Sequence, residues 1–389
     1  MSGAPTVPRG VGLYLAGVQL LFALGWVVYA AYLPELLEQA GLERRWAPWV
    51  LALDQLVFIV TDLVVGVWSD RAAAVQGRIG RVVLVATLGS ALAFLLLPWA
   101  APQGSPALLL VLTLAWAIPS SALRAPPLTL LGRYVAKPAQ PAMVALFALG
   151  LGLASAVSPY VGLALKGVDP RWPFALAALT LAAVTLGMVA AERALVRQRS
   201  SLAPAPGSAA SSAPPAPSAR LPAAPSARAG LTPAAALFLV AVVIVAASFQ
   251  LHVFLASAPL YRAAGGGESL AHLMPVFWVG FNLMLWPATR WVRRTGPPLA
   301  LAQAAVAGAL AVAAAHAAPS LPWLVAAQLA AGAAWAGMLC GAFVGALQFG
   351  HTGREGFFNG SLQSLLAVAA LSRLRRLPGW PAAEPSPAR

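Results

Sequence analysis

Charged residues are scarce in this sequence. They make up 9% of the 389 residues, and only 11 residues are acidic. Soluble domains carry about 25% charged residues because water covers most of their surface, so this composition excludes an ordinary soluble protein. Cysteine is almost absent as well. Cys340 stands alone, which excludes a disulfide within the chain, and no Cys/His cluster has the spacing of a zinc site.

The motifs of enzymes and of nucleotide-driven pumps are also missing. The chain contains no Gly-x-Ser-x-Gly turn, no phosphate-binding loop and no metal-binding histidine pair. We therefore expect no enzyme, no cofactor and no metal. A net charge of +14 would suggest nucleic acid in a soluble protein. Here the basic residues lie singly or in small groups between apolar runs, so we expect no nucleic-acid partner.

Apolar residues, by contrast, are abundant. They account for 60% of the chain, and the mean hydropathy is +0.78. A membrane-crossing helix needs ~20 largely apolar residues, whereas a barrel would need ~10-residue alternating strands. The long Ala, Leu and Val runs fit helices, so we predict an all-α polytopic membrane protein. Eleven runs qualify as spans: 11–34, 47–68, 82–100, 105–131, 141–165, 172–192, 232–260, 270–289, 298–317, 321–348 and 357–372.

The basic residues predict the orientation. A cytoplasmic N-terminus puts fifteen of them inside, namely Arg9, Arg71, Arg78, Arg81, Arg133, Lys137, Arg193, Arg197, Arg199, Arg220, Arg228, Arg290, Arg293, Arg294 and Arg354. Five then lie outside: Arg44, Arg45, Lys166, Arg171 and Arg262. Positive charge accumulates in cytoplasmic loops, so this bias indicates a cytoplasmic N-terminus. The Arg- and Ala-rich composition is typical of a GC-rich bacterial genome, and we expect a multi-pass monomer in the lipid bilayer of the bacterial cytoplasmic (inner) membrane.

One segment divides the chain in two. Residues 193–231 are almost wholly Ala, Pro, Ser and Arg, which cannot build a packed core, so we predict a disordered cytoplasmic linker. It separates a six-helix half at 1–192 from a second half at 232–372, which shows five spans and is followed by a basic tail at 373–389. A twelfth span is missing or atypical. Two helical halves on one linker are typical of a transporter that rocks one half against the other.

The loop after the second span carries the most specific pattern. It contains Gly66, then Asp70-Arg71 and, after five residues, Gly77-Arg78-Ile-Gly-Arg81. Gly66 permits close approach of a neighbouring helix, and Asp70 can accept hydrogen bonds from a helix N-terminus or pair with an arginine. We interpret this segment as a cytoplasmic gating loop. A simple positively charged anchor at the membrane surface is the alternative.

This loop resembles the major facilitator superfamily, whose signature between helices two and three is a Gly, three residues, Asp-Arg and then Gly-Arg. The five-residue spacer resembles the sucrose/proton symporters, and Asp62, Gly66 and Asp70 resemble the pattern of the glycoside/pentoside/hexuronide cation symporters. The resemblance implies a bundle of two six-helix halves. It also implies transport of a small-molecule substrate, such as a sugar, coupled to a proton or another cation.

Two acidic residues, Asp54 and Asp62, fall within a span. A carboxylate at membrane depth costs a few kcal/mol, so it needs a partner, a water-filled cavity or a proton. Both lie on the second helix, separated by ~12 Å of rise and roughly 80° of rotation, so both can face the bundle interior. We predict a proton or cation relay, in which Asp62 matches a cation-site aspartate of the symporters. A buried ion pair is the alternative.

Arg124 is the one cation well inside a span. Sucrose symporters carry a fourth-helix arginine in a similar Arg-Ala setting, so the resemblance implies a substrate or coupling residue, although their acidic residue earlier in that helix is absent here. Arg124 lies nine residues before Arg133, and Asp62 eight before Asp70, so the two opposite charges share a depth. We predict that they pair, or share a water network, in at least one state. Proton coupling then requires this pair to break, or Asp54 carries the proton.

Neutral polar and aromatic side chains within the spans are candidates to line the substrate path. They are Gln19, Trp26, Tyr29, Gln55, Gln250, His252, Trp278 and Asn282. Amides can bind sugar hydroxyls and Trp can stack on a sugar face, while hydrogen bonding between helices explains each residue equally well. Three functions remain open: a proton- or cation-coupled transporter of a small polar solute, a drug or metabolite efflux antiporter, and a non-transporting scaffold or sensor. The intramembrane Asp and Arg argue against the last.

Overall fold

Long helices account for nearly all of the regular structure. The computed structural model describes residues 9–72, 78–201, 231–351 and 353–374, and no strand occurs among them. Within those ranges, ten segments are long and apolar enough to cross a membrane. They are Arg9–Gln39, Arg44–Ala72, Arg78–Gln103, Pro106–Tyr134, Lys137–Ala164, Arg171–Arg199, Pro233–Ala263, Leu270–Thr295, Pro297–His316 and Leu321–Gly350. The predicted all-α polytopic architecture is confirmed.

The helices before residue 202, called here the first half, include two interrupted spans. They are α1 (Arg9–Gln39), α2 (Ala47–Ala72), α3 (Arg78–Ala100), α4 (Pro106–Ser120), α5 (Ala125–Tyr134), α6 (Gln140–Ala164), α7 (Arg171–Thr185) and α8 (Met188–Ser201), with 3-10 turns at Arg44–Trp46, Ala101–Gln103, Ser121–Leu123 and Lys137–Ala139. The predicted span 105–131 is therefore not one helix but α4, a 3-10 turn and α5. Pro126 and Pro127 explain this break, because proline donates no N–H and crowds the preceding turn.

The helices after residue 230, called here the second half, pack around a central helix. They are α9 (Pro233–Leu251), a π-helical turn η5 (His252–Ala256), α10 (Ser257–Ala263), α11 (Leu270–Leu273), α12 (Pro275–Thr295), α13 (Pro297–His316), α14 (Leu321–Gly350) and α15 (Glu355–Leu374). Most of α14 is buried, between α12 and α13. A Cβ added at Gly332 of α14 would overlap the backbone of Phe277, so glycine permits this crossing.

Two predicted boundaries differ from the structure. Helix α8 continues past Arg193, where a disordered linker is expected, and ends at Ser201. The rest of the expected linker, 202–230, and residues 375–389 of the expected tail lie outside the described residues. The last predicted span, 357–372, corresponds to helix α15. This helix is not among the ten segments that are long and apolar enough to cross a membrane. Its polar residues Asn359 and Gln363 are buried within the protein, so this helix does not need a wholly apolar surface.

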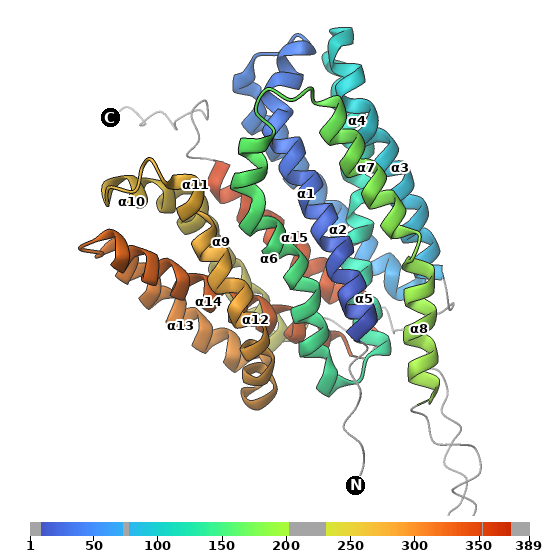
Figure 1. The fold of residues 1–389 in the computed structure, drawn as a ribbon. Coiled ribbons are helices and arrows are strands. Elements are labelled where there is room, and N and C mark those ends of the chain that lie inside the picture. Colours follow the sequence, from blue (N-terminus) through green and yellow to red (C-terminus); the bar gives the residue numbers. More distant parts are fainter. Residues whose placement is uncertain (1–8, 73–77, 202–230, 352, 375–389) are drawn as a thin grey trace, which may run out of the picture.

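The two halves meet along two pairs of helices. Helix α15 packs along α2, and α12 packs against α6. In Figure 1, α9, α12, α13 and α14 lie on the left and α3, α4 and α7 on the right, with α1, α2, α6 and α15 between them. The helices of the second half lean away from α1 toward the top of the view. The α2–α15 contact therefore joins the halves at one end of the bundle more closely than at the other.

Candidate functional site

The predicted ion pair between Asp62 and Arg124 is present. Arg124 Nε lies 2.9 Å from Asp62 Oδ2. The Asp62 side chain is fully buried, whereas the Arg124 side chain is 18% exposed. The Arg124 guanidinium also lies 4.4 Å from the centre of the Phe58 ring, one turn earlier on α2. A cation over an aromatic face is stabilised by the ring quadrupole, so α2 holds Arg124 by two kinds of contact.

Hydroxyl contacts on both sides of this pair fix α2 against α4 and α5. Thr61 Oγ1 lies 2.6 Å from Ser121 Oγ, in the 3-10 turn that precedes Arg124. Nearer the end of α2, Ser69 Oγ lies 3.1 Å from Thr129 Oγ1 of α5. These buried polar contacts lock the axial register of the two segments. They account for the equal depth of Asp62 and Arg124 that the sequence spacing predicts.

Asp54 has a different environment. It is fully buried, and the Tyr29 hydroxyl donates a hydrogen bond of 2.9 Å to its Oδ2. Its Oδ1 has no hydrogen-bond partner among the described residues. Tyr29 is fully buried here and holds Asp54, and its place on a substrate path stays a prediction. A buried carboxylate with one hydrogen bond and no counter-ion is better accommodated in its neutral, proton-carrying form.

The end of α2 joins the two halves. Asp70 Oδ1 accepts a hydrogen bond of 2.5 Å from Gly356 N, and its Oδ2 accepts one of 2.8 Å from Phe357 N. These amides belong to the first turn of α15, whose N–H groups have no partner within the helix. One turn earlier on α2, a Cβ added at Gly66 would lie 2.8 Å from Gly360 Cα. Both predicted features, the capped helix N-terminus and the close helix approach, are thus present.

The remaining loop residues lie outside this contact. Arg71, Arg78 and Arg81 are exposed, as expected for groups at the headgroup level, and Gly77 lies outside the described residues. The sequence reasoning missed Gly356 and Gly360, although their four-residue spacing is the signal of a close helix crossing in a membrane.

It also missed Glu192. This fully buried residue of α8 accepts a hydrogen bond of 2.7 Å from Gly80 N and so ties α8 to the start of α3. A carboxylate just after a hydrophobic span normally signals only a solvated helix end, so no local pattern distinguishes Glu192 from such a residue.

The polar residues of the second half mostly bind one another. His252 Nε2 lies 3.0 Å from Gln328 Oε1, and Gln328 Nε2 donates to Ser257 Oγ at 3.2 Å. Ser257 in turn donates to the carbonyl of His252 at 2.9 Å, across the π-helical turn. His252 is 4% exposed, and its predicted place on the substrate path stays a prediction. It belongs to a network between η5, α10 and α14.

Among the other predicted lining residues, Asn282 lies at the contact between the halves. The Asn282 amide donates to the carbonyl of Trp278, and its Oδ1 faces Gly152 of α6. Trp26 and Trp278 are half-buried, in aromatic clusters of the first and second half respectively. The others, Gln19, Gln55 and Gln250, are buried or half-buried on α1, α2 and α9.

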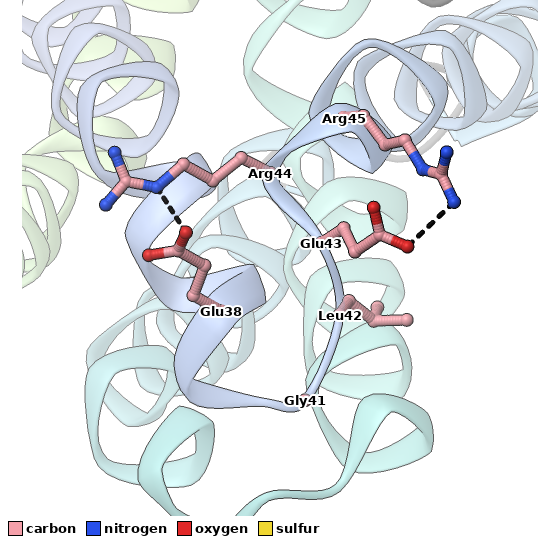
Figure 2. Close-up of a pocket in the computed structure, with 6 residues that line it drawn as sticks. All are labelled: Glu38, Gly41, Leu42, Glu43, Arg44 and Arg45. Atoms are coloured by element: carbon pink, nitrogen blue, oxygen red, sulfur yellow. Dashed lines mark hydrogen bonds and ion pairs between the residues drawn. The ribbon is translucent and has the colours of Figure 1, made fainter.

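One open depression lies apart from this site. It encloses about 520 Å³ at the loop between α1 and α2 and is lined by Glu38, Gly41, Leu42, Glu43, Arg44 and Arg45 (Figure 2). Two exposed ion pairs cross it, Arg44–Glu38 at 2.5 Å and Arg45–Glu43 at 2.7 Å. Exposed pairs of this kind contribute little to stability, and no buried polar group points into the depression.

Three solved structures of transporters are similar to this fold. Among curated proteins none matches the sequence. The human organic anion transporter MFSD10 superimposes with a TM-score of 0.67 at 16% identity, covering 95% of this chain and 92% of that one. A bacterial homologue of the iron transporter ferroportin, in an outward-facing state, gives a TM-score of 0.63 at 16% identity, covering 94% and 91%. A proton:xylose symporter gives a TM-score of 0.59 at 14% identity, and the match covers 94% of this chain and 87% of that one.

These identities are low, so the three structures show a shared fold and nothing about the solute. The family model described as the Major Facilitator Superfamily is more decisive, because it matches residues 15–372, nearly the whole chain. The chain therefore belongs to the Major Facilitator Superfamily and is a transporter of a solute across a membrane.

Proposed function

We propose that the chain is a secondary active transporter, which moves a small polar solute together with a proton or another cation by alternating access. We place it in the bacterial cytoplasmic membrane with its N-terminus in the cytoplasm. The observation that carries this proposal is the buried Asp62–Arg124 ion pair on the helix that joins the halves. A Cβ added at Gly360 of α15 would lie 2.5 Å from the carbonyl oxygen of Asp62. The charged pair and the contact between the halves thus share one stretch of α2.

This arrangement links binding to gating. The ion pair neutralises both buried charges while it is intact. A solute or a proton that breaks it changes the electrostatics of α2 next to Gly66 and Gly360. The same helix ends at Asp70, which caps α15 across the contact. Opening of this end then requires the Asp70 hydrogen bonds and the glycine crossing to separate together.

The solute class and the direction of transport rest on weaker support. The loop resembles those of the sucrose and glycoside symporters, which makes a sugar one candidate. The three structural relatives are described as handling an organic anion, iron and xylose, so the fold does not choose among solutes. An efflux antiporter would use the same buried charges, and the sign of the gradient that accelerates transport separates the two.

Reconstituted vesicles test the proposal. We expect an imposed pH gradient to accelerate uptake of at least one solute from a panel of sugars, organic acids and drugs. Asp62→Asn should abolish this acceleration while solute exchange without a gradient continues, because the variant cannot take up a proton at that position. Glu43→Gln, at an exposed carboxylate far from the pair, is the control. If Asp62→Asn retained full pH-driven uptake, Asp62 would be discarded as the coupling residue.

A further inference from the structure

One side of the Arg124 guanidinium is open. Its Nε is buried and contacts Asp62. Among the residues that the structure describes, none forms a hydrogen bond with either terminal Nη atom, and neither Nη is among the buried atoms without a partner. The exposed 18% of this side chain therefore belongs to the part that Asp62 does not use. Two N–H-bearing nitrogens, side by side in one plane, face away from the pair.

The accessible charge at this depth is thus positive. Asp54 and Asp62 are both fully buried, so an approaching solute meets Arg124 rather than either carboxylate. A guanidinium with two free nitrogens matches a carboxylate, which it binds through two parallel hydrogen bonds. In the described spans of the second half, no Asp, Glu, Lys or Arg lies at this depth. Asp62 balances the charge of Arg124, and the guanidinium keeps two further N–H-bearing nitrogens for one acceptor group.

We propose that the transported solute is a small organic monocarboxylate, which binds Arg124 in competition with Asp62. This inference rests on the proposed proton-coupled transport and names its substrate class. The solute carboxylate occupies the free Nη atoms and takes over the role of counter-ion. Asp62 then loses its partner and accepts a proton from water. The loaded protein carries one carboxylate and one proton, so net charge does not move across the membrane.

The surroundings of Asp62 allow this exchange. Arg124 is the one ionisable group that contacts it among the described residues. The 3-10 turn before Arg124 contributes the hydroxyl of Ser121, and α15 faces Asp62 with Gly360. On α2 itself, Asp54 is ~12 Å away along the helix, and Asp70 is the same distance toward the gate. The protonation of Asp62 therefore depends chiefly on whether Arg124 is paired with Asp62 or with the solute carboxylate.

Of the neighbouring aromatic groups, the half-buried Trp26 suits the organic part of such a solute, while Phe58 is fully buried beneath the guanidinium. Phe58 lies under the guanidinium at 4.4 Å, and the half-buried Trp26 is 5.4 Å from Phe58. A neutral sugar cannot replace Asp62 as the counter-ion of Arg124, so it would not free Asp62 to take up a proton, and a cation would be repelled by the guanidinium. The observed charges therefore favour an anion over both.

Binding to the purified full-length protein is the first test. We would measure Tm by tryptophan fluorescence with two matched pairs of probes, gluconate against sorbitol and benzoate against benzamide. The carboxylate of at least one pair should raise Tm, because it binds the folded protein, and its neutral counterpart should not. Arg124→Lys should weaken that carboxylate about tenfold, since an ammonium group lacks the planar fork. If no carboxylate shifts Tm, or if the neutral probe of each pair is equally effective, the assignment is overturned.

A second variant guards against misfolding. Arg124→Gln alone leaves Asp62 without its counter-ion, whereas the Asp62→Asn/Arg124→Gln double variant is neutral at both positions. The double variant should fold, as judged by its thermal transition, and should lose the carboxylate-dependent Tm shift completely. A persistent shift in this folded variant would show that the carboxylate binds elsewhere and would overturn the assignment.

Uptake into vesicles separates this inference from the proposed function. Gluconate uptake should accelerate with a pH gradient and stay unchanged when a potassium diffusion potential is added, because the proton balances the carboxylate. If sorbitol responds to the pH gradient and gluconate does not, the carboxylate assignment is overturned and proton-coupled transport stands. If gluconate enters at a rate indifferent to the pH gradient, proton coupling fails while the carboxylate assignment stands.

Discussion

The contact between α2 and α15 predicts a strong response to one added methyl group. Gly66→Ala places a Cβ against the backbone of α15, 2.8 Å from Gly360 Cα and 3.1 Å from Gly360 N, and still closer to the carbonyl oxygen of Gly356. All three partners are backbone atoms, so no side chain can turn aside. Because carbon atoms pack at ~3.5–4.0 Å, the two helices must separate by ~1 Å in this conformation.

The expected magnitude follows from overpacking. Inserting a methyl group into a well-packed contact costs about 1–3 kcal/mol. The cost applies only while α2 and α15 are in contact, so it shifts the equilibrium toward conformations in which this end is open, by about 5- to 150-fold. Gly89→Ala in α3 is the matched control, because its added Cβ meets nothing within 4 Å. This control also accounts for the higher helix propensity of alanine.

Distance measurements between two spin labels can detect this shift toward the open conformation. Labels at Arg71 of α2 and Arg294 of α12, both exposed, report the separation of the halves at this end once Cys340 has been replaced by alanine. Gly66→Ala should move the distance distribution to longer values, and Gly89→Ala should leave it unchanged. If both variants give the wild-type distribution, the α2–α15 crossing does not hold the halves together and the reasoning is refuted.

Three further perturbations have expected outcomes. Asp70→Asn leaves one acceptor oxygen for two amides of α15. Loss of the cap should shift the equilibrium toward the open conformation by about 0.5–2 kcal/mol, so the distance between the same spin labels should increase. An unchanged distance distribution would contradict the capping role. Asp62→Asn leaves Arg124 unpaired and should lower the free energy of unfolding by up to about 3–5 kcal/mol. The Asp62→Asn/Arg124→Gln double variant should recover most of this loss. Equal Tm values for the single and the double variant would argue against the ion pair. Tyr29→Phe removes the hydrogen bond to Asp54 and should lower the free energy of unfolding, measured by thermal unfolding, by about 1–3 kcal/mol. Tyr160→Phe, at an exposed tyrosine, is the control and should leave stability unchanged. Equal effects of the two variants would show that the Tyr29 hydroxyl does not contribute to stability.

Composition and local spacing determined much of this protein. Long apolar runs must become helices in lipid, because every backbone polar group has to be satisfied within its own segment. The rarity of charge in the spans made Asp54, Asp62 and Arg124 conspicuous, and counting residues to the nearest loop charges was enough to predict the Asp62–Arg124 pair. The loop pattern likewise predicted that Gly66 is a close-approach position and that Asp70 can cap a helix.

Only the tertiary structure decided which helix Gly66 and Asp70 contact. The partners of Gly66 and Asp70 lie near Gly356, almost three hundred residues later, and no local pattern specifies such a pairing. Whether a polar side chain faces a passage or a neighbouring helix was equally open, and Tyr29 and His252 proved to bind Asp54 and Gln328 inside their own halves. Hydrogen bonds and close packing between segments depend on rotation about each helix axis. That rotation is set by all the helices of the bundle together, so one helix's sequence cannot reveal it.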